Sequence, residues 1–283
     1  MTTTLDTFVR RHDFLVCVDS DGCAIDNLTA KHRLCFAPCL IREWRLEAWS
    51  DRVTALWERI NLNSLTRGIH RYRALALALE EIHRDLTPVE DLPVLIRWVS
   101  YTEDFSEASL EREIQSTASP LLKKARRWSA AANQAIEALS WEQKQVFPGV
   151  REALTETAAA ADIAVISSAN REAVLQEWEH GGLASLADGF LCQEAGKKTR
   201  LIAGLCRKGY PEGHILVIGD APSDRAGAEL NGVPFFPVLV GREPESWAHF
   251  PYALRMFLNG SYQAEQARLS EEFMQNLSGG QVP

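Results

Sequence analysis

The first candidate for chemistry is the segment of residues 19–22, Asp-Ser-Asp-Gly, which directly follows the apolar run 14–18. A parallel sheet presents the residues that follow its strands at one edge, so Asp19 and Asp21 would share a loop there. An aspartate can attack phosphorus and form an acyl phosphate, and a second carboxyl group two residues later can act as acid and then as base. The motif could therefore supply a nucleophile and a proton-transfer acid, whereas a polar turn after a strand is the competing interpretation and a calcium loop a weaker one.

A second acidic group repeats this arrangement, because Asp220 and Asp224 follow the apolar run 215–218. Carboxylates that meet in one crevice raise each other's pKa values and would repel a phosphate dianion. A hard divalent cation removes that conflict, and Mg²⁺ favours a few carboxylates, waters and a substrate phosphate in octahedral geometry. The sequence therefore predicts a magnesium site with four acidic members: Asp19, Asp21, Asp220 and Asp224.

Two further polar segments could bind a phosphoryl group. Ser167 and Ser168 follow the apolar run 163–166 and precede a helical pattern, so hydroxyl and backbone N–H groups could converge on an anion. An ordinary helix cap would use the same residue types. Lys197 and Lys198 precede another helical pattern and offer a cation, although lysines in such positions are usually solvated. The residues alone do not choose between Lys197 and Lys198.

The elements that must position these residues are of two kinds. Short apolar runs predict buried strands at residues 14–18, 163–166, 190–192, 215–218 and 234–239. Amphipathic stretches predict helices between the later runs, at residues 151–160, 171–179, 199–208 and 224–230. This alternation indicates an α/β fold with a Rossmann-like parallel sheet core, a three-layer α/β/α arrangement with helices on both faces.

The interval 24–146 differs because it lacks convincing β runs and carries apolar residues at helical spacing. It predicts an inserted all-helical domain, and we expect its six tryptophans to form mainly its core: Trp44, Trp49, Trp57, Trp98, Trp128 and Trp141. The turn signal of residues 147–150, Phe-Pro-Gly-Val, marks the return to the sheet. The predicted domains are therefore residues 1–23 with 147–240 for the α/β core and 24–146 for the helical insertion.

Residues 241–283 form a helical C-terminal extension in this interpretation. Leu269, Phe273 and Leu277 are spaced by four and make a narrow apolar stripe. The stripe should pack on the core or at an interface with a second subunit, so both a monomer and a homodimer are open.

Composition excludes some partners. The 283 residues carry a formal net charge of -8, which disfavours binding to nucleic acid or to an anionic membrane. The first apolar run is too short for a signal peptide or a membrane span. The six cysteines form neither a dense disulfide framework nor paired CxxC motifs, so we expect free thiols in a cytoplasmic protein.

The order of these motifs resembles the haloacid dehalogenase-like superfamily: DxDG at 19–22, a hydroxyl after a strand, a lysine, and GDxxxD at 219–224. The resemblance covers about residues 12–22 and 147–240. The helical insertion, closed by Pro-Gly-Val at 148–150, resembles the helical cap of the phosphoglycolate phosphatase and phosphonatase-like branch.

That resemblance implies roles for individual residues. Asp19 would be the nucleophile and, with Asp220 and the backbone carbonyl of Asp21, a magnesium ligand. Asp21 would protonate the leaving group and later activate water, while Asp224 would be a ligand on the metal side or an anchor behind it. Ser167 and the amides beside it would hold phosphoryl oxygens. The family lysine, Lys198 in the favoured alignment, would neutralise the nucleophile and the transferring group.

An acid two residues after the nucleophile resembles phosphatases and phosphomutases of the superfamily and favours phosphate-ester chemistry. We expect a magnesium-dependent phosphatase that acts on a small phosphorylated metabolite through an aspartyl phosphate. A phosphomutase remains open, as does a phospho-accepting receiver module, although its acceptor would follow a middle strand and no large insertion is expected there. A catalytically silent scaffold is a third alternative, which the complete acidic set disfavours.

Substrate choice should depend on the cap, because a closing lid supplies contacts and excludes water. Its most basic cluster comprises Arg67, His70, Arg71 and Arg73. A helix could present Arg67 and Arg71 on one face and so bind the substrate, whereas a solvated surface with salt bridges is the competing interpretation. Nothing in the sequence identifies the substrate.

Overall fold

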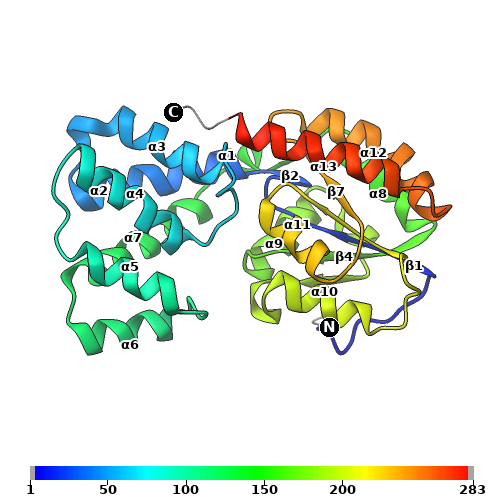
Figure 1. Cartoon of the computed structure of the whole chain (residues 1–283), viewed down its shortest axis with the longest axis horizontal. Coiled ribbons are helices and arrows are strands. Elements are labelled where there is room, and N and C mark those ends of the chain that lie inside the picture. The colour runs from blue at the N-terminus through cyan, green and yellow to red at the C-terminus, as the bar shows by residue number, and fades with distance from the viewer. Residues whose placement is uncertain (1–3, 280–283) are drawn as a thin grey trace. The chain divides into compact units, whose positions relative to one another are not determined.

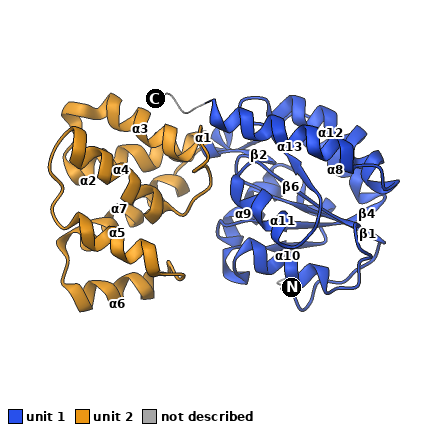
Figure 2. Cartoon of the chain, in the orientation of Figure 1, with its two compact units in different colours: residues 1–28, 141–279 blue, residues 29–140, 280–283 orange. Residues whose placement is uncertain are grey.

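The computed structural model describes residues 4–279, which form two compact units (Figure 2). The core unit comprises residues 4–28 and 141–279, and the helical unit comprises residues 29–140. These boundaries lie a few residues inside the predicted insertion 24–146. The reason is local pairing: β2 (Ile25–Asp26) and β3 (Gln145–Val146) form an antiparallel ribbon that belongs to the core unit.

A five-stranded parallel sheet forms the centre of the core unit (Figure 1). Its strand order is β5-β4-β1-β6-β7. The strands are β1 (Phe14–Val18), β4 (Ala161–Ile166), β5 (Gly189–Leu191), β6 (Ile215–Gly219) and β7 (Phe235–Pro237). The central strand β1 pairs with β4 and β6, and Val18 lies opposite both Val165 and Ile218. The loops that follow these three strands therefore start at one edge of the sheet. The predicted α/β fold is confirmed.

Both faces of the sheet are covered because side chains alternate along each strand. Val16 and Val18 belong to one apolar cluster, and Leu15 and Cys17 belong to another. The first cluster includes residues of α8 (Val150–Ala158), α9 (Arg171–His180) and α12 (Glu243–Leu258). The second includes residues of α10 (Lys198–Cys206) and α11 (Pro222–Leu230). This is the expected three-layer arrangement.

The C-terminal helix α13 (Gln263–Ser278) packs on the core unit of its own chain. Its stripe residues Leu269, Phe273 and Leu277 are all buried. The ring of Phe273 lies edge-on to that of Phe235 in β7, with 5.5 Å between the ring centroids. Of the two predicted positions for the stripe, the chain adopts packing on the core.

The helical unit contains a π-helical segment (Lys31–Phe36) and several α-helices: α2 (Ala37–Trp44), α3 (Ser50–Asn61), α4 (Arg71–Asp85), α5 (Leu92–Tyr101), α6 (Glu107–Thr117) and α7 (Pro120–Glu137). Trp57, Trp98 and Trp128 are fully buried in its core, while Trp44 and Trp49 pack against that core partly buried. Trp141 differs from the prediction because it lies in the core unit and is exposed. Within residues 4–279, no helix has the length and apolar character needed to cross a membrane.

Candidate active site

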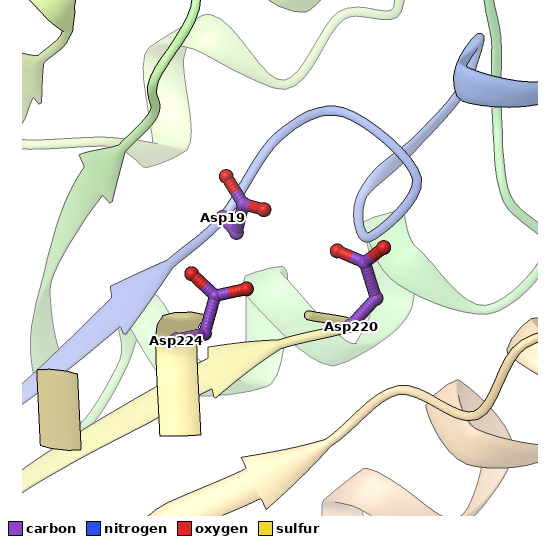
Figure 3. A group of neighbouring side chains, drawn as sticks. All are labelled: Asp19, Asp220 and Asp224. Carbon is purple, nitrogen blue, oxygen red and sulfur yellow. The ribbon is translucent and has the colours of Figure 1, made fainter. Parts of the chain in front are cut away.

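Three carboxylates that are distant in sequence meet at the edge of the sheet where β1 and β6 end (Figure 3). One oxygen from each of Asp19, Asp220 and Asp224 lies within 4.8 Å of the other two. Asp19 directly follows β1, Asp220 follows β6, and Asp224 lies in the first turn of α11. Their side chains are buried, since the three residues are 8%, 1% and 2% exposed.

Local backbone contacts fix these acids in place. The N–H of Asp19 donates to the carbonyl of Ile218, which extends the parallel pairing by one residue. The N–H of Ala221 donates to Oδ2 of Asp224 at 3.1 Å, so this carboxylate also caps its own helix. A Cβ on Gly219 would lie 2.4 Å from the Cβ of Asp224. The absence of a side chain at this position therefore allows the close approach of Asp224.

Lys198 contacts two of the three carboxylates. Its Nζ lies 2.8 Å from Oδ1 of Asp19 and 2.5 Å from Oδ1 of Asp224, and its side chain is 11% exposed. Lys198 is the first residue of α10, whereas Lys197 precedes the helix and is exposed. The structure thus places the favoured lysine, and not its neighbour, beside the predicted nucleophile.

The electrostatics of this group follow from burial and repulsion. Burial raises the pKa of Asp19 well above its usual value, and the neighbouring acids Asp224 and Asp220 raise it further, while Lys198 opposes the shift. The pKa of Asp224 is raised by burial and by Asp220, again against Lys198. Burial alone would lower the pKa of Lys198, but Asp19 and Asp224 raise it. Lys198 is therefore a permanent cation at neutral pH.

The donor set fits a hard divalent cation. Lys198 can neutralise one of three buried carboxylates, which leaves an excess of negative charge where a phosphate dianion would have to approach. Carboxylate oxygens are among the ligands that Mg²⁺ prefers. Asp19, Asp220 and Asp224 are the residues that would hold such an ion.

The fourth predicted acid, Asp21, is not a member of this three-carboxylate group. Its Oδ1 accepts a hydrogen bond from Nδ2 of Asn27 at 2.8 Å, and the residue is half-buried. The predicted metal role of the Asp21 side chain stays a prediction: the carboxylate lies outside this close group, and its Oδ1 is bound by Asn27. The contribution of its backbone carbonyl to a metal site stays a prediction.

Ser167 and Ser168 have different environments. Ser167 directly follows β4, is buried, and lies at the same sheet edge as Asp19, because Val18 pairs with Val165. Its Oγ accepts from the N–H of Ala169 at 3.1 Å. Ser168 is exposed. Ser167 is thus placed where a phosphoryl group could be bound, and the cap of α9 is supplied separately, by Asn170.

The two arginines predicted to share a helix face do not do so. Arg67 lies in a turn before α4, where its Nη1 donates to the carbonyl of Leu62 at 2.9 Å, and α4 begins only at Arg71. Gly68, with a φ of 74°, and His70, which caps the helix, separate the two. Arg67 is buried, Arg71 is half-buried and Arg73 is exposed, so a solvated basic surface does not describe the cluster as a whole.

Arg71 is held by neutral groups. Its Nη1 donates to Oγ of Ser129 at 3.1 Å and to Oδ1 of Asn133 at 2.5 Å, and its guanidinium lies 4.9 Å from the ring centroid of Phe36. Within residues 4–279, no ion pair of Arg71 with a carboxylate is found. Burial lowers the pKa of Arg71. The ordinary pKa of an arginine is so high that the side chain nevertheless remains a cation.

Sequence reasoning missed two residues beside Asp21. Nδ2 of Asn27 donates both to Asp21 and to Oε2 of Glu177, the latter at 2.9 Å. Glu177 lies on α9 and is buried. Neither position carried a signal, because an asparagine after a short strand and a glutamate within an amphipathic helix are ordinary surface residues in a sequence.

Comparisons with known proteins agree with this geometry. Residues 98–238 match the family model described as haloacid dehalogenase-like hydrolase. The matched segment contains Ser167, Lys198, Asp220 and Asp224, and it begins after Asp19. The structure places Asp19 in contact with Lys198 and close to Asp220 and Asp224. No curated protein matches the chain.

Solved structures with the same fold include a haloacid dehalogenase-like hydrolase from Bacteroides fragilis, with 16% identity, a TM-score of 0.52, and coverage of 82% of this chain and 92% of that chain. A protein described as a phosphoglycolate phosphatase from Lactobacillus delbrueckii subsp. bulgaricus has 15% identity, a TM-score of 0.49, and coverage of 80% and 85%. A haloacid dehalogenase-like family hydrolase from Streptococcus pneumoniae has 12% identity, a TM-score of 0.48, and coverage of 83% and 90%. At these identities the first likeness is one of fold.

Proposed function

We propose that the chain, whose residues 98–238 match the haloacid dehalogenase-like hydrolase family, is a Mg²⁺-dependent phosphatase for a small phosphorylated metabolite. The observation that carries the proposal is the contact of Lys198 with Asp19, beside two further buried carboxylates that could hold a divalent ion. Acid-rich sites of this kind suit phosphoryl transfer, where the protein positions groups and stabilises charge.

In the first step, a carboxylate oxygen of Asp19 attacks phosphorus, the bond from phosphorus to the ester oxygen breaks, and the leaving alkoxide takes a proton from Asp21. In the second step, Asp21 removes a proton from water, and the water oxygen attacks phosphorus. The acyl phosphate bond then breaks, which releases inorganic phosphate and restores the carboxylate of Asp19. The same residue thus serves as acid and then as base.

Other groups would hold the phosphoryl oxygens during both steps. Lys198, already in contact with Asp19, would offset the negative charge of the nucleophile and of the transferring group. Ser167 and the backbone amides that follow it would donate to phosphoryl oxygens at the start of α9. A magnesium ion bound by the carboxylates would add positive charge on the phosphoryl group.

We further propose that Arg71 binds an anionic group of the substrate. The guanidinium of Arg71 is satisfied only by the neutral oxygens of Ser129 and Asn133, which a substrate carboxylate or phosphate could replace or supplement.

The test is phosphate release from a panel of phosphorylated metabolites, with Mg²⁺ and after its removal by a chelator. We expect Asp19→Asn to abolish turnover and Asp21→Asn to slow it by about 10²- to 10⁴-fold. Acid-quenched enzyme should retain label from a radiolabelled phosphate ester in the Asp21→Asn variant and not in Asp19→Asn. Wild-type rates in either variant would contradict the assigned roles.

The products distinguish the rival activities. A phosphomutase would return the phosphoryl group to its substrate and release little phosphate. A receiver module would accumulate a stable phosphoprotein, and a silent scaffold would do neither. Steady release of phosphate supports the proposal, and each of the other three outcomes replaces it with a different function.

A further inference from the structure

Asn27 connects Asp21 to Glu177 through two hydrogen bonds. Nδ2 of Asn27 lies 2.8 Å from Oδ1 of Asp21 and 2.9 Å from Oε2 of Glu177. Asn27 is completely buried, and Glu177 is 3% exposed. Glu177 is 156 residues after Asp21 in the sequence, so the fold alone brings it here.

The chemistry of the two neighbours fixes the orientation of the asparagine amide. Ionised carboxylates only accept hydrogen bonds, and an amide nitrogen has two protons to donate. The NH₂ group must therefore face both acids, one proton to each, and the amide oxygen must point elsewhere. Oδ1 of Asn27 is buried without a hydrogen-bond partner among the described residues. The two charge-assisted bonds thus decide the orientation even though the oxygen is left unsatisfied.

The helix that carries Glu177, α9, also contacts Ser20, the residue before Asp21. Trp178, the next residue of α9, donates from Nε1 to Oγ of Ser20 at 3.0 Å. Both Ser20 and Trp178 are fully buried. Adjacent residues of α9 therefore fix the loop before and after Asp21.

We propose that Glu177 is a positioning residue for the acid–base step: by holding Asn27, it fixes the orientation of the Asp21 carboxylate. The N–H of Asn27 occupies one lone-pair direction of Oδ1 at 2.8 Å, so the proton that Asp21 transfers must point in another direction. The inference rests on the proposed phosphatase function, and it adds residues that act through Asp21 without touching the substrate.

Removal of either link should lower kcat and leave KM almost unchanged. We expect Asn27→Ala and Glu177→Leu to reduce kcat by about 10- to 100-fold, the effect of a small misplacement of a reacting group. Glu177→Gln should recover most of this loss, because its side-chain carbonyl still accepts from Asn27. Glu179→Leu, at an exposed position of the same helix, is the matched control and should have the wild-type kcat.

A double-mutant comparison separates positioning from general damage to the fold. In an Asp21→Asn background, where proton transfer is already lost, Asn27→Ala or Glu177→Leu should lower kcat by less than about twofold more, since residues that act as one unit are not additive. If the losses multiply instead, the two residues do not act through Asp21, and the inference is overturned.

Crystal structures of the same variants give a measurement that does not depend on phosphatase activity. A displaced or rotated Asp21 carboxylate in Asn27→Ala and Glu177→Leu, restored in Glu177→Gln, supports the inference. An Asp21 side chain in the wild-type position in both variants overturns it. If the wild-type protein releases no phosphate, the proposed function fails, and this structural comparison still decides whether Glu177 positions Asp21.

Discussion

Replacement of Lys198 by methionine removes the positive charge from the three-carboxylate group while keeping a side chain of similar length. In the native protein, Nζ of Lys198 lies within 2.8 Å of Asp19 and 2.5 Å of Asp224. Both contacts are shielded from solvent, so the two carboxylates would be left buried without their cation. The substitution should therefore affect both stability and turnover.

The size of the effect on stability follows from the burial of the pair. Removing one partner of a buried ion pair typically costs about 3–5 kcal/mol, because the remaining charge is left uncompensated. The acids here can reduce this cost by taking up protons, a response favoured by the raised pKa of Asp19. We therefore expect the free energy of unfolding in chelator to fall by about 3 kcal/mol at pH 8 and by less at pH 5.

Urea unfolding, followed by tryptophan fluorescence, measures the stability of Lys198→Met. Phosphate release measures its turnover, which should fall at least about 100-fold. Added Mg²⁺ should restore more stability to Lys198→Met than to the wild type, because the ion replaces part of the missing charge. Lys197→Met is the control, since that residue is exposed. The reasoning is refuted if Lys198→Met keeps the wild-type stability and rate, or if Lys197→Met loses as much.

Two further predictions concern other parts of the chain. Burial opposes ionisation of Asp162, yet hydrogen bonds, including one of 2.6 Å from Tyr210, hold its pKa below the usual value. Its contribution to stability should be present above about pH 4 and lost as the pH falls further, and Asp162→Asn should cost about 2 kcal/mol at neutral pH with a flatter acid profile in urea unfolding. Arg71→Gln should raise KM on the order of tenfold for metabolites with a second anionic group, and less for phenyl phosphate, in parallel steady-state assays. Equal changes in KM for both substrates would argue against an anion contact at Arg71.

Much of the core unit could be predicted because its signals are local. The predicted strand 14–18 coincides with β1, and the predicted helix 171–179 differs from α9 by one residue. Buried parallel strands are continuous apolar runs, and the acids that follow them stand out against that background. The edge of the sheet then brings Asp19 and Asp220 together, although 201 residues separate them in the sequence.

The errors occurred where a single backbone position or a distant contact decides the outcome. Gly68 and the cap at His70 delay α4, so Arg67 falls outside the helix that the spacing of the arginines had indicated. The periodic spacing of apolar residues does not reveal the residue that caps a helix, because the residue types that cap helices also occur throughout loops. Asn27 and Glu177 were missed for another reason: their importance lies in a hydrogen bond across 150 residues, which no local pattern reports.

The last turn of α9 also contacts Trp141, where the chain returns to the core unit. Asn27, held by Glu177, lies just before the boundary at residue 28, and Trp141 is the first residue after the return. The ring of Trp141 stacks on that of His180, with 4.2 Å between centroids. Glu177 and His180 are one turn apart on the same helix, so one rigid element anchors the chain where it leaves the core unit and where it re-enters. That element also holds Asp21 through Asn27, so the Asp21 carboxylate is attached to the core unit close to the point where the helical unit begins.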